Sequence, residues 1–234
     1  MKRNLGTMVI ASFVFQYLFY YNANILNGLQ FLKGVPITDS FSTEAMYLMA
    51  WYFPIFFILM FFSGYTKKNF VSQGIAFIVR NESKFKLSMK GLIKVSMLTL
   101  LLVLFQSTIY LFNYPIEKVE YNTLILSLVI YYLFLLCAVS VLSYLDLYMP
   151  SQISFISVNV LILAGTLVSK FYNQSYKYLD YFNIISNSMG YRNGLGGNSS
   201  YNFLNPLIVI FITISMIIFI QILSWFKVKK MDII

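Results

Sequence analysis

The chain has 234 residues, of which 59% are hydrophobic and only 11% charged, and it carries a net charge of +9. A soluble domain has about 25% charged residues, so this composition excludes an ordinary soluble protein and predicts an integral membrane protein. The sequence contains no histidine and one cysteine, Cys137, which excludes histidine-ligated metals, histidine general bases and a disulfide framework.

Six apolar runs follow one another along the chain, over residues 5–25, 45–62, 92–112, 123–145, 153–168 and 207–226. A helix that crosses about 30 Å of hydrocarbon needs about 20 residues, and the six runs meet or approach that length. The first run is longer than the apolar region of a signal peptide, about 7–15 residues, and no small-residue cleavage site follows it. We therefore expect an all-α protein with one transmembrane domain, residues 1–234, built from six transmembrane helices.

The basic residues divide unevenly between the connections of these runs. Twelve of the 17 lysines and arginines fall on the side that holds both termini, and five of the eight acids fall on the other side. Connections rich in lysine and arginine stay in the cytoplasm, so both termini are predicted to be cytoplasmic. Topology thus explains the positive charge better than a nucleic-acid partner does, and no such partner is expected.

A few polar and kink-forming residues lie within the apolar runs. They are candidates for lining a substrate path: Gln16 and Tyr20 in the first run, Phe53 and Pro54 in the second, and Asn159 in the fifth. Pairing of polar groups between neighbouring helices is the simpler interpretation. Pro54 has no N–H group and should kink its helix.

The connection between the second and third runs is basic and partly amphipathic. Apolar residues recur at helical spacing over residues 71–79, which predicts a short cytoplasmic helix. After a turn, the same spacing resumes from residue 85, and we expect an interfacial helix that leads into the third span. Its basic residues are Lys84, Lys86, Lys90 and Lys94. The alternative is a collar of lysines that extend to the membrane surface and bind no partner.

Several function classes are excluded by what the sequence lacks. No charged residue lies near the centre of any run, whereas ion-coupled carriers place ionisable groups there to bind the coupling ion. No hydroxyl has a base beside it to activate it as a nucleophile, so we expect no catalytic residues and no metal site. A GxxxxGK[ST] loop is also absent, so the chain has no P-loop with which to bind ATP.

Six spans without an energy source of their own predict a subunit that another protein drives. The chain resembles the permease subunits of ABC-2-type exporters, and among them the small bacterial permeases of bacteriocin and peptide-antibiotic export or immunity systems. The resemblance covers essentially the whole length. It is carried by the Trp-Tyr-Phe-Pro stretch at residues 51–54, by residues 74–84, and by the long outer connection before the last run.

The resemblance implies a coupling helix after the second span that docks in a groove of the ATPase subunit. Carried onto this sequence, that role falls on Phe70, Val71, Gly74, Ile75, Phe77, Ile78 and Arg80, and residues 84–94 become a connecting helix. The implied partners are a separate ABC ATPase that holds ATP and Mg²⁺, a second permease copy or a sister permease, and lipid of the bacterial plasma membrane. This chain would hold no cofactor. The implied substrate is hydrophobic or amphipathic, with a peptide as the expected class.

Two alternatives remain open. A stand-alone membrane immunity or scaffold protein would show the same spans and charge distribution without an ATPase, and it would differ in the role of residues 70–80. A lipid-modifying enzyme would have to use residues of the outer connection, such as Asp180 and Arg192.

Overall fold

The computed structural model describes residues 10, 14, 30–36, 41–68, 84–111, 121–172, 181–193, 195 and 204–230, and these residues are helical or in turns, with no strand among them. Five helices are long and apolar enough to cross a membrane. They are α3 (Phe41–Phe62), α5 (Lys84–Leu111), α6 (Tyr121–Asp146), α7 (Ser151–Tyr172) and α11 (Pro206–Lys230). The prediction of an all-helical protein with several helices that can cross a membrane is confirmed for the described residues. The first predicted span, residues 5–25, lies outside the described residues apart from Ile10 and Val14.

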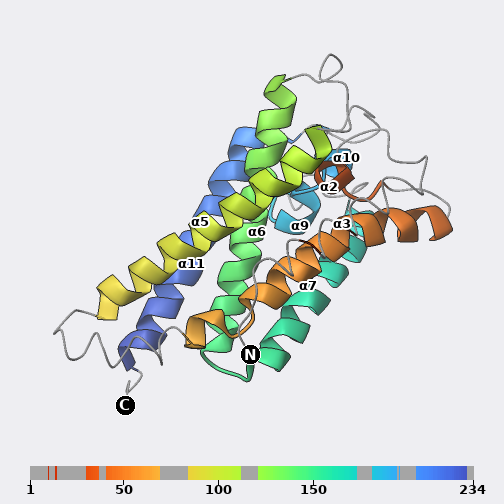
Figure 1. The fold of residues 1–234 in the computed structure, drawn as a ribbon. Coiled ribbons are helices and arrows are strands. Elements are labelled where there is room, and N and C mark those ends of the chain that lie inside the picture. The colour runs from red at the N-terminus through yellow and green to blue at the C-terminus, as the bar shows by residue number, and fades with distance from the viewer. Residues whose placement is uncertain are drawn as a thin grey trace.

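Helix α6 is the centre of the bundle, and the other four long helices pack around it (Figure 1). In the most apolar 18-residue stretch of α6, 50% is buried, compared with 22–33% in the corresponding stretches of the other four helices. A helix that is apolar on all sides is buried within a bundle. The run of residues 123–145 is therefore mostly apolar because neighbouring helices cover it on several sides.

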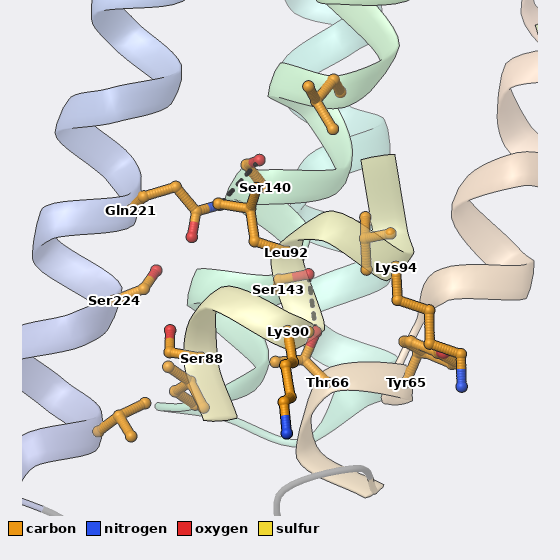
Figure 2. A pocket seen from close by; sticks show the side chains of 15 residues that line it. Tyr65, Thr66, Ser88, Lys90, Leu92, Lys94, Ser140, Ser143, Gln221 and Ser224 are labelled. Carbon is orange, nitrogen blue, oxygen red and sulfur yellow. Dashed lines mark hydrogen bonds between the residues drawn. The ribbon is translucent and has the colours of Figure 1, made fainter. Parts of the chain in front are cut away.

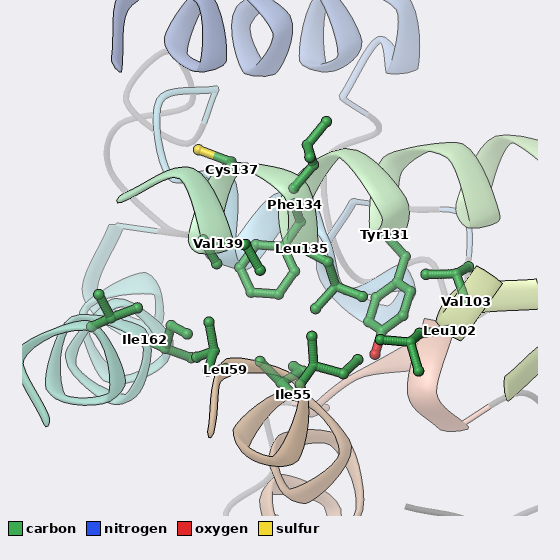
Figure 3. Close-up of a cluster of buried hydrophobic side chains, with 14 of the residues drawn as sticks. Ile55, Leu59, Leu102, Val103, Tyr131, Phe134, Leu135, Cys137, Val139 and Ile162 are labelled. Carbon is green, nitrogen blue, oxygen red and sulfur yellow. The ribbon is translucent and has the colours of Figure 1, made fainter. Parts of the chain in front are cut away.

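The main hydrophobic core lies between α3 and α6, with residues from α5 and α7 at its edges (Figure 3). On α3, Trp51, Ile55 and Leu59 recur at the four-residue spacing of one helix face, and all three are fully buried. Opposite them, the ring of Phe134 stacks on Trp51 at a centroid distance of 5.8 Å. Helix α3 continues through Pro54, which is buried.

Helix α5 differs from the expected arrangement, because the predicted interfacial helix and the third span form one continuous helix of 28 residues. At 1.5 Å per residue it is about 42 Å long, whereas the hydrocarbon core is about 30 Å thick. The extra turns are at its beginning, where Lys84, Lys86 and Lys90 are located. A polar start and an apolar remainder are compatible with a single helix because neither contains a proline, and the single glycine, Gly91, is tolerated within it.

The two ends of the bundle have different compositions. We call one the lysine end: it holds the end of α3, the start of α5, the α6–α7 turn and the end of α11 (Figure 1). Its described lysines are Lys67, Lys68, Lys84, Lys86, Lys90, Lys94, Lys227, Lys229 and Lys230. We call the other the cap end, where the short helices α2 (Gln30–Lys33), α9 (Ile184–Asn187) and α10 (Gly190–Asn193) pack together and against the long helices.

Candidate functional site

A cavity of about 120 Å³ lies at the lysine end, between the end of α3 and helices α5, α6 and α11 (Figure 2). The lining residues of α6 and of α11 are three, four or seven positions apart and lie on one face of each helix, whereas those of α5 cover a wider arc. Those of α6 are Leu136, Ser140, Ser143 and Leu147; those of α11 are Gln221, Ser224 and Val228; those of α5 include Ser88, Gly91, Leu92 and Val95. The lining therefore combines hydroxyl and amide groups with aliphatic side chains.

The polar wall of the cavity is held by two hydrogen bonds between helices. Gln221 donates from Nε2 to the Ser140 hydroxyl at 3.1 Å, and Thr66 donates to the Ser143 hydroxyl at 2.9 Å. A serine hydroxyl that accepts one hydrogen bond still has its own proton to donate. The wall formed by α6 can therefore donate hydrogen bonds from two hydroxyls to a group in the cavity.

Two lysines of α5, Lys90 and Lys94, also line the cavity, one helical turn apart, and both are solvent-exposed. Figure 2 shows their amines pointing away from the serine wall, toward the outside of the bundle. The Lys94 amine lies 6.0 Å from the centroid of the Tyr65 ring, over its face. The two side chains therefore border the cavity, and their ammonium groups place positive charge on its outer side.

The end of α3 is fastened to the turn between α6 and α7. Gly64 has a φ of +67°, the left-handed conformation that commonly ends a helix. Its N–H donates to Oδ2 of Asp146 at 2.6 Å, and Asp146 is fully buried. The Ser63 hydroxyl donates to the carbonyl of Ser151 at 3.0 Å. A displacement of the chain after residue 64 would therefore be transmitted to the α6–α7 turn.

The chain between α3 and α5 reaches this cavity before and after residues 69–83. Tyr65 and Thr66, shortly before these residues, line the cavity, and so do Ser88 and Lys90, shortly after them. Residues 69–83 themselves, including all of Phe70, Val71, Gly74, Ile75, Phe77, Ile78 and Arg80, lie outside the described residues. Described residues on both sides of the predicted coupling segment thus line the same cavity.

The predicted basic helix is located on the first three turns of α5. Of its lysines, Lys90 and Lys94 line the cavity, Lys86 is exposed, and Lys84 is the first residue of the helix. The predicted stripe of lysines therefore borders a cavity that sequence reasoning did not anticipate.

The candidate substrate-path residues lie elsewhere. Gln16 and Tyr20 are outside the described residues. Asn159 accepts a hydrogen bond at Oδ1 from the Tyr52 hydroxyl and donates from Nδ2 to the Phe155 carbonyl at 2.7 Å. Phe53 and Pro54 follow Tyr52 on α3, and neither they nor Asn159 line the cavity. The arrangement matches the simpler interpretation, in which Asn159 pairs with a neighbouring helix.

The polar residues of the cavity wall were not among the predicted site residues. Ser140 and Ser143 lie three positions apart within one apolar run, and Gln221 and Ser224 have the same spacing within another. Residues three apart share a helix face. Two such polar pairs, in two different apolar runs, were therefore the sequence feature from which a polar site between helices could have been predicted. The sequence alone does not tell which helices are neighbours.

The outer residue Arg192 has a structural role at the cap end. Its guanidinium group is buried and donates to the carbonyl of Val35 at 3.0 Å and to that of Thr166 at 2.8 Å. Beside it, burial and the neighbouring Tyr47 raise the pKa of Tyr191 to about 12, so this phenol stays neutral. Asp180 lies outside the described residues. Arg192 thus connects α10 to α7 and to the chain after α2.

Comparison with known proteins gives a family. The sequence profile described as "Protein of unknown function (DUF2705)" matches residues 9–234. A relative from Bacillus subtilis (strain 168), described as "Uncharacterized protein YybK", is 31% identical over 225 residues, which are 92% of this chain and 89% of the relative. No solved structure matches. The chain belongs to the DUF2705 family.

Proposed function

We propose that this DUF2705 protein is the membrane-spanning permease subunit of an ATP-binding cassette exporter, driven by a separate ATPase. The observation that carries the proposal is that described residues on both sides of residues 69–83 line one cavity: Tyr65 and Thr66 before them, and Ser88 and Lys90 after them. A partner that moves this segment would act on α3 and α5 together. The sequence has no P-loop and no charged residue near the centre of a span, which is consistent with an external energy source.

The lysine end is the cytoplasmic end in this proposal. Nine described lysines lie there, and lysine-rich connections remain on the cytoplasmic side of a membrane. Residues 70–80 would then meet a soluble ATPase. With six spans, both termini would also be cytoplasmic, in the plasma membrane of a bacterial cell.

The proposed mechanism is a mechanical one. ATP binding would bring two ATPase subunits together and displace residues 70–80 of each permease. The displacement would pass through α5, and through the bond of Gly64 to Asp146 into the α6–α7 turn. Such a switch requires contacts that differ between two states of the bundle, and the small polar contacts around the cavity can rearrange at low energetic cost because each contributes only about 1 kcal/mol.

The substrate class follows from the resemblance to exporters of peptides. A hydrophobic or amphipathic peptide would leave the cytoplasm or the inner leaflet along a path between two permeases. The second permease would be another copy of this chain or a sister chain. ATP and Mg²⁺ would bind to the ATPase, so this chain needs no cofactor.

The test is co-purification followed by an activity measurement. The tagged full chain, expressed in its native cell, is expected to retain a protein with Walker motifs and to raise its rate of ATP hydrolysis. Ile75→Asp combined with Phe77→Asp should abolish both effects, because two buried charges would disrupt an apolar docking helix. The matched control is Ile75→Leu with Phe77→Leu, which keeps the apolar character.

Two results would overturn the proposal. One is a chain that still performs its cellular function when no Walker-motif protein is bound to it. This result is expected of a stand-alone immunity or scaffold protein. The other is unchanged ATPase stimulation in the aspartate variant, provided that it inserts in the membrane at the normal level.

A further inference from the structure

We propose that the lysine-end cavity binds the phosphate-bearing headgroup of an anionic membrane lipid, with the acyl chains of the lipid along α5. The proposal rests on the cavity and on the exposed face of α5, and it does not require an ATPase partner. It assigns a ligand to the cavity, whereas the proposed transport mechanism assigns none and uses only the contacts around it.

The donors around the cavity suit a phosphate group. Ser140 and Ser143 have hydroxyl protons to donate on the inner side, and Lys90 and Lys94 provide positive charge at the mouth. The described acid near this end is Asp146, whose carboxylate is directed at the Gly64 amide and does not line the cavity. An anion in the cavity would therefore meet donors and cations.

The volume of the cavity limits what enters it. A cavity needs about 10–15 Å³ of this kind of volume to hold one water molecule, so about 120 Å³ leaves room for a small polar group such as a phosphate. We place only the headgroup in this space. A lipid bound here would have to place its chains outside the cavity.

Helix α5 offers a surface for those chains next to the lysines. Met89, Ile93 and Met97 recur every four residues along one face, and their exposed fractions are 41%, 51% and 63%. Lys90 and Lys94 each follow one of these residues directly in the sequence, so the lysine stripe borders the apolar stripe. A cation above an apolar face at the membrane boundary is the arrangement that binds anionic lipids, whereas a soluble phosphate would gain nothing from the apolar stripe.

The test uses the purified full chain in detergent, with lipid binding measured by native mass spectrometry. The probes are dioleoyl phosphatidylglycerol, dioleoyl phosphatidylcholine and sn-glycerol 3-phosphate. We expect the phosphatidylglycerol to bind about 10-fold more tightly than the phosphatidylcholine, and the glycerol phosphate to bind far more weakly than either. Lys90→Gln with Lys94→Gln should reduce affinity for phosphatidylglycerol about 25-fold, because each lysine beside the bound phosphate contributes about a factor of five.

Lys67→Gln with Lys68→Gln is the matched control. It removes the same charge from exposed residues of the same end that do not line the cavity, and we expect less than a 2-fold change. A second variant, Ser140→Ala with Ser143→Ala, removes the inner donors without changing the charge and should reduce affinity about 25-fold, the effect of losing two hydrogen bonds of about 1 kcal/mol each.

Three outcomes would overturn the proposal. Equal binding of the two phospholipids would show that the headgroup is not recognised. Equal losses of phosphatidylglycerol affinity in the two double-lysine variants would mean that the lipid is attracted by the charge of the whole lysine end and not by the cavity. Binding of glycerol phosphate as tight as that of phosphatidylglycerol would assign the cavity to a soluble phosphate compound.

Discussion

The two ends of the bundle use polar side chains in opposite ways. At the cap end, the polar groups of Arg192, Asn187 and Asn193 are buried and donate to backbone carbonyls. At the lysine end, Ser140 and Ser143 border a cavity. The comparison shows that buried polarity by itself does not indicate a binding site in a membrane bundle. A candidate site is distinguished by polar side chains whose hydrogen-bond donors are not already bonded to backbone carbonyls of the protein.

Close packing characterises the described part of the cap end. A β-carbon at Gly165 of α7 would lie 2.3 Å from a methyl carbon of Ile185, and one at Gly34 would lie 2.4 Å from Met189. Gly34 also has a φ of +74°, which other residues seldom adopt. Two glycines thus let the short helices approach the long ones. Among the cavity-lining helices, a β-carbon at Gly91 would meet nothing within 4 Å.

The largest effect is expected from Arg192→Ala at the cap end. Two buried carbonyls, those of Val35 and Thr166, would lose their donor, and each buried group left unsatisfied costs about 1–3 kcal/mol. We expect the free energy of unfolding to fall by about 2–5 kcal/mol, measured by denaturant titration in detergent. Lys68→Ala, at an exposed residue, is the control. A change below about 0.5 kcal/mol for Arg192→Ala would contradict the structural role of the cap end.

Asp146→Asn should have the next largest effect. The neutral amide keeps the shape of the side chain but weakens the acceptor for the Gly64 N–H, and hydrogen bonds to charged groups contribute about 1.5–3 kcal/mol. In addition to this loss of stability, we expect faster proteolysis after Lys67 or Lys68, because the end of α3 would be released. Unchanged cleavage would show that the bond does not fasten this end.

Gly64→Ala tests the same attachment through the backbone. Alanine at a φ of +67° is strained by about 1–2 kcal/mol, and its β-carbon would lie 3.1 Å from that of Ser151. We expect a loss of stability of that size, again by denaturant titration. Gly91→Ala is the matched control, because the added methyl would be in open space and alanine favours a helix. Equal losses for the two variants would contradict the assignment of Gly64 as the residue that ends α3.

The smallest effect on stability is expected from Ser143→Ala at the cavity. The variant removes one hydrogen bond, from Thr66, and a bond of this kind contributes about 1 kcal/mol. We expect a loss of about 1 kcal/mol or less in the same titration, smaller than that of Arg192→Ala. If Ser143→Ala were the more destabilising of the two, the cavity would be part of the structural framework of the protein.

The length of the apolar runs was sufficient to predict the described long helices, since each of these helices contains most or all of one run. The spacing of apolar residues after residue 85 placed the lysines of α5 on a helix, as the structure has them. The change from polar to apolar residues near residue 92 led us to expect two elements, an interfacial helix and a span, where the backbone forms one continuous helix. The cavity could not be predicted, because it depends on which helices are neighbours: Gln221 meets Ser140 across 81 residues of sequence. The role of Arg192 was hidden for the same reason, since its partner Val35 is 157 residues away.

The placement of the two ends on opposite sides of the membrane is tested most directly by cysteine labelling in whole cells. Cys137 is the single cysteine and is buried, so Cys137→Ala gives a suitable background. Phe182→Cys lies at the cap end, where the side chain is 68% exposed, and Lys68→Cys lies at the lysine end. We predict that a membrane-impermeant maleimide labels the Phe182→Cys variant in intact cells and the Lys68→Cys variant only after permeabilisation. Labelling of the Lys68→Cys variant in intact cells would contradict a cytoplasmic lysine end, and with it the proposed docking of an ATPase there.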